Sequence, residues 1–348
     1  MRRPIIGATV GAVTAGTLFL AGCSSSSSSP SASGSSSSGS ASAPVTLRLG
    51  LLANITHAPA LVGIQKGFFT KDLGSNKLTT TVYNSGTQET TAILAGQLDA
   101  AYVGPNPAIN AFQKSGGTAI KIISGAATGG ASVVVKPSIT SAAGLKGQTV
   151  DTPSLGNTQD VAVRYWLKQN GLATTTTGGG DVTIKPTNPN SDAVLQFQSG
   201  QIAGASEPSP YDVEMVKDGG KVLFTEPGVT TLLIVTQSFL KAHPAVVSDL
   251  LKGQIQANDY IAKDNSAAQT SANTELTALT GKGIKSSILP AAFKEITFTN
   301  DPDASSLTTD AQQAKAVGLL TSTNLSGIFD LAPLNQLLQA AGESQVKS

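Results

Sequence analysis

Cysteine, histidine and charge are all scarce in this sequence. One cysteine, Cys23, and two histidines, His57 and His243, occur among 348 residues. A single cysteine excludes a disulfide framework within the chain. One cysteine and two histidines are also too few for this chain alone to build a zinc ribbon or an iron–sulfur site. Charged residues are 13% of the chain and the net charge is +1, so no overall field attracts nucleic acid. The composition predicts a neutral globular protein with no cofactor and no nucleic-acid partner.

Common enzyme motifs are also missing. The sequence has no G-x-S-x-G, no H-E-x-x-H, no Walker A motif, and no G-x-G-x-x-G between a strand and a helix. With two histidines and no cysteine beyond Cys23, most hydrolase triads are unavailable. Paired carboxylates remain an alternative, but no informative pair stands out. We therefore expect a protein that is not an enzyme.

The N-terminus has the layout of a targeting segment. Arg2 and Arg3 precede an apolar stretch, 4–20, and the tetrapeptide Leu-Ala-Gly-Cys then ends at Cys23. This layout is typical of a secretory signal, and the tetrapeptide resembles a bacterial lipobox. We expect 1–22 to be a lipoprotein signal peptide. The Ser-rich segment 23–44 would then tether the protein to the extracytoplasmic face of the cell membrane through acylated Cys23.

From about residue 45 the pattern alternates between strands and helices. The alternation runs to about residue 136, restarts near 145 and gives way after 236 to apolar helical periodicity. Such alternation predicts an α/β fold with largely parallel sheets. We expect two α/β lobes, with a helical C-terminal return that packs back on the first lobe.

Candidate ligand contacts follow several of the expected strands. In open α/β sheets ligands bind beyond the carboxyl ends of strands, where helix N-termini attract anions. Asn106 is expected to cap a helix that begins at Pro107, and Asn157 to cap the helix 157–170. Alternatively, these residues only punctuate the helices. His57 either contacts ligand or opens the first helix, and Glu207 meets either a ligand ammonium or a hinge group. The candidate contacts are Thr56, His57, Asn106, Pro107, Thr128, Gly129, Gly130, Gly156, Asn157, Thr158 and Glu207.

Five passages in order resemble solute-binding proteins of ABC importers, specifically the nitrate/sulfonate/taurine type. They are G-Q-L-D-A-A-Y-V-G-P-N-P (96–107), A-G-L-K-G-Q-T-V (143–150), L-Q-F-Q-S-G-Q-I-A (195–203), Glu207-Pro208, and F-T-N-D-P (298–302) with the helix 331–342. Gly144, Ala203 and Ser209 depart from the family pattern. The resemblance implies a two-lobed type II periplasmic-binding-protein fold, with a first lobe at 45–133, a second lobe at 134–232 and a return, 233–348, to the first lobe. It also implies hinge strands near 131–136 and 228–235, about which the lobes close over the ligand.

The same resemblance implies a lipoprotein that captures a small solute between its lobes and delivers it to permease subunits. The cleft motifs contain no Lys or Arg, so we expect an anionic head group to bind at the start of the helix 157–170. An aliphatic sulfonate or taurine fits best, with nitrate or a thiamine-pyrimidine precursor as alternatives. A monomer is expected. Alternatives of another class are a secreted lipoprotein enzyme and a structural surface lipoprotein.

Overall fold

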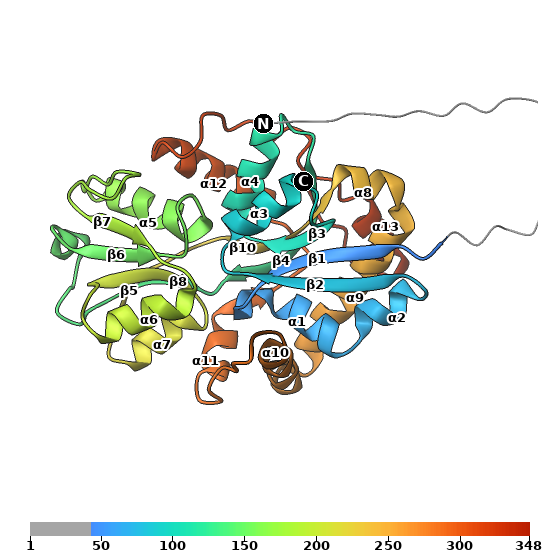
Figure 1. Cartoon of the computed structure of the whole chain (residues 1–348), viewed down its shortest axis with the longest axis horizontal. Helices are drawn as coiled ribbons and strands as arrows, with labels where there is room; N and C mark the ends of the chain where they lie inside the picture. Colours follow the sequence, from blue (N-terminus) through green and yellow to red (C-terminus); the bar gives the residue numbers. More distant parts are fainter. Residues whose placement is uncertain (1–42) are drawn as a thin grey trace, which may run out of the picture. The chain divides into compact units, whose positions relative to one another are not determined.

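The computed structural model describes residues 43–348, so the predicted signal peptide, Cys23 and nearly all of the Ser-rich segment lie outside the described residues. Two sheets organise the described part (Figure 1). The first has six strands in the order β11-β4-β10-β3-β1-β2. Its strands are β1 (Thr46–Leu52), β2 (Lys77–Tyr83), β3 (Ala100–Val103), β4 (Ile120–Gly129), β10 (Val229–Thr236) and β11 (Ile296–Phe298).

The second sheet has five strands in the order β7-β6-β8-β5-β9. They are β5 (Ala131–Val135), β6 (Thr149–Thr152), β7 (Thr183–Pro186), β8 (Gly204–Pro208) and β9 (Lys221–Thr225). Each sheet has a parallel half, β1 with β2 and β3 in the first sheet and β6 with β7 and β8 in the second. The expectation of largely parallel sheets is therefore only half right, because β10 runs antiparallel to β3 and β4, and β5 antiparallel to β8 and β9.

Helices follow most of the strands. They are α1 (Ala58–Gln65), α2 (Phe68–Leu73), α3 (Gly86–Leu94), α4 (Pro105–Lys114), α5 (Thr158–Gln169), α6 (Asn190–Gln198), α7 (Tyr211–Lys217), α8 (Gln237–Ala242), α9 (Pro244–Lys263), α10 (Asn265–Thr280), α11 (Leu289–Lys294), α12 (Ala304–Ala316) and α13 (Ala332–Ala340), with two short 3-10 turns, η1 (Ile55–His57) and η2 (Ala142–Leu145). No helix within residues 43–348 is both long enough and apolar enough to cross a membrane.

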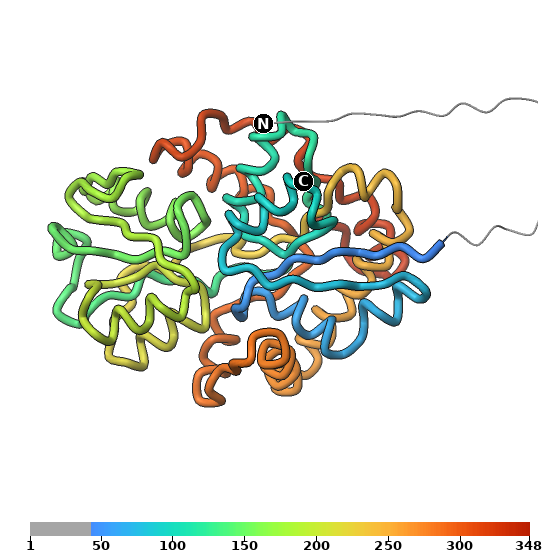
Figure 2. Tube along the Cα trace, viewed as in Figure 1, coloured from blue at the N-terminus to red at the C-terminus, as the bar shows by residue number. Residues whose placement is uncertain are grey.

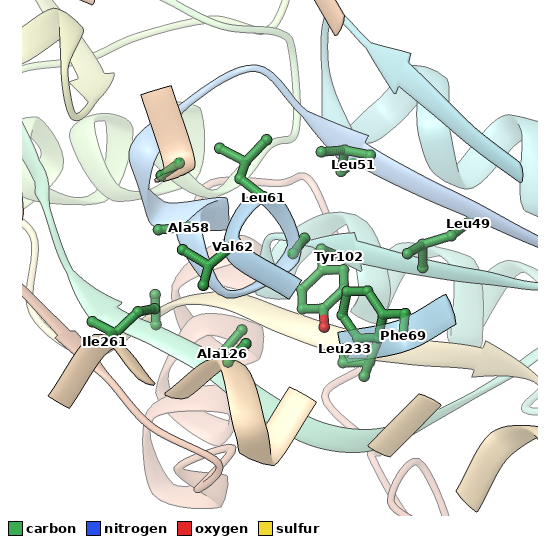
Figure 3. Close-up of a cluster of buried hydrophobic side chains, with 14 of the residues drawn as sticks. Leu49, Leu51, Ala58, Leu61, Val62, Phe69, Tyr102, Ala126, Leu233 and Ile261 are labelled. Carbon is green, nitrogen blue, oxygen red and sulfur yellow. The ribbon is translucent and has the colours of Figure 1, made fainter. Parts of the chain in front are cut away.

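The C-terminal return closes the core of the first sheet. Leu49, Leu51 and Tyr102 from its strands are fully buried against Leu61 and Phe69 (Figure 3). Side chains of α9, α10 and α13 belong to the same cluster. The chain trace shows α9 and α13 beside the first sheet and α10 on the far side of α1 (Figure 2). We expected the return to be wholly helical, and it is not. Ile296–Phe298 forms β11, which extends the sheet by pairing with β4.

The chain passes between the sheets at two close crossings. The first is Gly129–Gly130, between β4 and β5, where both residues have positive φ (74° and 73°). The second lies between Thr225, the end of β9, and Val229, the start of β10, and the two crossings are joined by the bond from Gly129 N–H to the Gly228 carbonyl (2.9 Å). The lobe division at 133/134 and 232/233 stays a prediction. β5 begins at Ala131 and β10 at Val229, three and four residues before the predicted divisions.

Candidate functional site

A small buried cavity lies where the parallel strands of both sheets end. Its volume is about 20 Å³, which is room for roughly one water molecule. The lining comes from segments that follow β1, β2 and β3 in the first sheet and β6, β7 and β8 in the second. It consists of Leu52, Asn54, Thr56, His57, Asn84, Ser85, Gly86, Gly104, Pro107, Pro153, Asn157, Thr158, Gln159, Asn190, Pro208 and Thr230. We call this the central cavity.

Five helices begin at the central cavity. Their first turns or N-caps supply lining residues, namely His57 for α1, Ser85 for α3, Gly104 for α4, Asn157 for α5 and Asn190 for α6. Each helix N-terminus carries unpaired N–H groups and about half a positive charge. Within residues 43–348, no Lys, Arg, Asp or Glu side chain lines the cavity. Its potential therefore comes from oriented peptide dipoles, which favour an anionic or acceptor-rich group.

A buried network positions the loop before α5. Asn157 caps this helix as predicted, with its Oδ1 accepting from the Asp160 backbone N–H (3.0 Å). The Asp160 carboxylate accepts from the Thr152 hydroxyl and the Gly156 N–H, and forms an ion pair of 2.9 Å with Arg164. Arg164 and Asp160 are both almost completely buried. These bonds hold the loop in place, and the side chain of Thr158, the next residue after Asn157, thereby lies at the cavity.

Thr158 is the lining residue whose hydroxyl is left unengaged. Its Oγ1 is buried and has no hydrogen-bond partner among the described residues. A buried hydroxyl without a partner costs about 1–3 kcal/mol, so a ligand that accepts from it recovers that cost. The hydroxyl also lies close to the first sheet, because a Cβ on Gly104 would stand only 2.5 Å from it. Gly104 has an ordinary φ of −66°; it is required for this close approach and not for its backbone conformation.

His57 is neutral and has a defined orientation. Its Nδ1 accepts from the Leu52 N–H at 3.2 Å, so Nε2 carries the proton and can donate. Burial lowers the pKa of His57 to about 3, which keeps the imidazole uncharged at neutral pH. The residue occupies the N-cap position of α1, without a side-chain capping bond, and also lines the cavity. The two interpretations that the sequence left open are therefore compatible with each other.

Thr56 lines the cavity, but its hydroxyl already has partners. It donates to Asn54 Oδ1 (2.7 Å) and accepts from the Thr231 hydroxyl (2.8 Å). The Asn54 oxygen also accepts from the Thr56 backbone N–H. This cluster shapes the wall below His57 and ties η1 to β10.

Six of the predicted contacts do not line the central cavity. Asn106, Thr128, Gly129, Gly130, Gly156 and Glu207 lie outside it. The expected cap at Asn106 is wrong, since Gly104 caps α4, Pro105 takes the first helical position and Asn106 donates to the Asp310 carbonyl. Proline suits that first position because its φ is already helical and its N–H is absent.

The glycines outside the cavity have structural reasons. A Cβ on Gly130 would meet the Ile296 side chain at 2.3 Å, and one on Gly129 would meet the Glu295 carbonyl at 2.8 Å. Thr128 pairs with Thr297 and Val229 inside the first sheet. Gly156 has a φ of 78° and donates its N–H to Asp160. All four belong to the sheet crossing or to the α5 loop.

Two of the cavity's loops were not among the predicted ligand contacts. Asn84 and Ser85 follow β2, and Asn190 follows β7. The signal that identified the other loops, polar residues directly after a parallel strand and before a helix, was present at both. Thr230, at the start of β10, gave no such signal because it lies within an apolar strand.

Buried carboxyl groups lie behind the cavity wall. Glu207 in β8 is completely buried, and burial, followed by the charges of Asp151, Asp212 and Glu226, raises its pKa well above the usual range. Burial likewise raises the pKa of Asp151 and of Asp212 to about 7. These groups are largely protonated at slightly acid pH and oppose an anion only weakly there. Within residues 43–348, no cluster of three metal-ligating side chains occurs.

Several contacts join the loops of the two sheets around the cavity. Ile55 N–H donates to the Ser209 carbonyl at 2.9 Å, and the Tyr211 hydroxyl donates to the Ala53 carbonyl at 2.8 Å. The hydroxyls of Thr87, in α3, and Ser154, which follows β6, lie 3.1 Å apart. The two groups of loops are therefore closed against each other.

Comparisons with known proteins agree with this architecture. A sequence model of the NMT1-like family matches residues 40–275, and no curated protein matches the sequence. The structure is similar to the alkanesulfonate-binding protein SsuA from Xanthomonas axonopodis pv. citri bound to MOPS, with 17% identity and a TM-score of 0.69, covering 83% of this chain and 99% of that one.

Two further solved structures show the same fold. The nitrate-binding protein NrtA from Synechocystis PCC 6803 is 15% identical with a TM-score of 0.70, covering 85% of this chain and 89% of that one. The aliphatic sulphonate binding protein SsuA from Escherichia coli is 17% identical with a TM-score of 0.63, covering 82% and 96%. The two sheets with their central cavity have the periplasmic-binding-protein fold, and the chain belongs to the NMT1-like family.

Proposed function

We propose that this protein is the extracytoplasmic solute-binding component of an ABC importer. The observation that carries the proposal is the central cavity, in which five helix N-termini from both sheets converge on neutral polar side chains. A site of this kind suits reversible capture, because it holds a solute without a nucleophile, metal or acid–base pair in its lining. The protein would act as a monomer and pass its solute to permease subunits.

The proposed solute is an aliphatic sulfonate or taurine. A sulfonate offers three acceptor oxygens, which match the N–H groups of the helix starts, the Thr158 hydroxyl and the His57 Nε2–H. Two of the similar structures are described as sulfonate-binding proteins. The head group would lie against the start of α5, beside Asn157 and Thr158.

Nitrate is a second candidate, supported by the size of the cavity. About 20 Å³ holds none of these solutes without movement of the walls, and nitrate requires the least movement. One similar structure is a nitrate-binding protein. A thiamine-pyrimidine precursor is the largest alternative and requires the most.

A ligand panel tests the proposal. Purified residues 24–348 would be titrated calorimetrically with short alkanesulfonates, taurine, nitrate and an aminopyrimidine precursor. Unfolding would be followed in parallel, since a ligand at about 100 times its Kd adds about 2.7 kcal/mol to the free energy of unfolding. Saturable binding without turnover supports the proposal. Conversion of any panel member, or no binding by any of them, contradicts it.

Lipid anchoring is proposed together with this function. The Leu-Ala-Gly-Cys site places the only cysteine where acylation requires a thiol. We expect Cys23→Ala to move the protein from the membrane fraction into the soluble fraction, and Cys23→Ser to do the same. Membrane recovery equal to that of the unaltered protein would show that Cys23 is not the anchor.

A further inference from the structure

A second crevice lies beside the crossing from β9 to β10. Its volume is about 300 Å³, at the lower end of the range for small-molecule sites. α5 contributes Tyr165 and Trp166, β9 contributes Phe224, the crossing contributes Glu226, and α12 contributes Asp310. We call this the hinge crevice. Thr158 and Thr230 separate it from the central cavity, since both residues line both spaces.

Two buried carboxyl groups in the hinge crevice each have an unengaged oxygen. Glu226 is 3% exposed and Asp310 is 9% exposed. Glu226 Oε1 accepts from the Ser206 hydroxyl, whereas Glu226 Oε2 and Asp310 Oδ2 have no hydrogen-bond partner within residues 43–348. Buried carboxyl oxygens are normally hydrogen-bonded or paired. Two of them lining one crevice indicate that a donor from outside the chain completes the site.

Aromatic rings supply the rest of the recognition surface. Trp166 and Phe224 stack with their centroids 5.5 Å apart and their planes at 15°, and both line the crevice beside Tyr165. Aromatic faces next to carboxylates are typical of sites for organic ammonium groups, which combine a positive charge with an apolar surface. We propose that the hinge crevice binds a small organic ammonium cation between Glu226, Asp310 and the Trp166–Phe224 pair.

The charges around the crevice agree with a cationic ligand. Burial, and then the charges of Glu226 and Asp303, raises the pKa of Asp310 well above its usual range. Burial also raises the pKa of Glu226 to about 7, with the Ser206 hydroxyl opposing the shift and Asp212 adding to it. A cation bound between the carboxyls would reverse these shifts.

The nearby cations of α5 do not neutralise these carboxyls. Arg164 pairs with Asp160 and donates to the Thr175 carbonyl, while Lys168 donates to the Ala316 carbonyl. Within the described part of the chain, no Lys or Arg lines the hinge crevice. The cation should therefore bind more tightly as pH rises and the two carboxyls ionise.

The single tryptophan of the chain provides a direct readout. Because Trp166 is the only Trp in the sequence and lines the crevice, its fluorescence reports directly on that site. Choline, ethanolamine and putrescine would be titrated up to millimolar concentration, with sodium chloride as the ionic control. We expect a saturable change in emission with at least one of the amines, stronger at about pH 8 than at about pH 6.

Isosteric variants separate a charge effect from damage to the fold. Glu226→Gln keeps the acceptor for Ser206, and Asp310→Asn keeps the size of its side chain. Each should weaken amine binding by about tenfold or more without lowering the melting temperature. Glu343→Gln, on the surface, removes the same charge as Glu226→Gln and should leave the affinity unchanged.

Three results would overturn the assignment. They are no saturable response to any of the three amines, a response equal to that of sodium chloride, and a response to calcium but to no amine. Amine affinity that survives in both Glu226→Gln and Asp310→Asn would also reject it. Neither substitution touches the central cavity, so sulfonate or nitrate binding serves as a separate measurement on the same variants.

Discussion

At the scale of single residues, the Thr158 hydroxyl is the sharpest test of the central cavity. It is buried, unengaged among the described residues and at the start of α5. Thr158→Val keeps the shape and removes the donor, so affinity for the solute should fall about tenfold or more, at roughly 1.4 kcal/mol per decade. Thr158→Ser restores the hydroxyl and should restore most of the binding. Calorimetric titration of both variants gives the comparison.

Unchanged affinity in Thr158→Val, with normal melting, would mean that the head group binds elsewhere. The start of α4 would then be the next candidate, since Gly104 and Pro107 also line the cavity.

Asp212 predicts a pH dependence of stability at the residue scale. Burial, partly opposed by the Ser209 hydroxyl bond, raises the pKa of Asp212 from 3.8 to about 7. The folded state therefore holds a proton that the unfolded state loses above about pH 4, and stability falls as pH rises from about 4 to about 7. Asp212→Asn keeps the Oδ1 acceptor for Ser209 and Val213 and removes this titration.

The measurement is urea unfolding of both proteins at two pH values. Between about pH 5 and about pH 8, Asp212→Asn should gain about 2–3 kcal/mol relative to the unaltered protein. The contribution of His57 to the pH dependence has the opposite sign, because its lowered pKa destabilises the fold as pH falls below about 6.5. This contribution is the same in both proteins and cancels in the comparison. A difference independent of pH would show that Asp212 is ionised throughout the range.

At the scale of elements, α5 depends on its internal ion pair. Arg164 and Asp160 are 1% and 0% exposed and 2.9 Å apart. Arg164→Met leaves a buried carboxylate without its counter-charge, which should cost about 3–5 kcal/mol in unfolding free energy. The double variant with Asp160→Asn removes the unpaired charge and should recover part of the loss. Denaturant unfolding measures both, and a loss below about 1 kcal/mol in the single variant would contradict the role of the pair.

At the scale of the whole folded region, solute capture requires the loops of the two sheets to separate and close. The closed cavity holds about one water. We expect small-angle scattering of the protein from residue 24 onward to show a smaller radius of gyration with saturating solute than without it. An unchanged radius, with binding confirmed independently, would count against closure.

Gly104 allows that closure to be blocked. An added Cβ would stand 2.5 Å from Thr158 Oγ1, so Gly104→Ala should hold the two groups of loops apart. Affinity should fall about tenfold and the ligand-induced change in radius should shrink. Gly144→Ala is the matched control, because its added Cβ would stand 3.3 Å from the Ile139 side chain, away from the cavity. If both variants show the same affinity and the same change in radius, Gly104 does not take part in closure.

The sequence predicted the elements that depend on local chemistry. Asn157 caps α5 as predicted, with its Oδ1 accepting from the Asp160 backbone N–H. The prediction for Asn106 is wrong because the helix begins before it, with Gly104 as its N-cap and Pro105 at its first position. Neighbouring residues compete for the N-cap position. Here the proline at position 105 suits the first helical position, which makes Gly104 the N-cap.

Long-range pairing could not be deduced in the same way. β10 reads as an apolar strand in any sheet, yet it lies antiparallel between β3 and β4, and β11 is only Ile296–Phe298. The alternation of residues along a strand encodes neither its partner nor its direction. Both depend on how the strands pack in the tertiary structure.

The sequence by itself therefore determined the α/β class, the family resemblance and several of the polar loops after strands, because each depends on residues close together in the sequence. Only the tertiary structure decided which of those loops meet. It placed Thr56, His57, Pro107, Asn157 and Thr158 around one cavity and left Glu207 behind its wall. It also brought Glu226 and Asp310, 84 positions apart in the sequence, into one crevice. The reason is physical: burial and charge act through space, and the two sheet crossings bring together side chains that no sequence spacing relates.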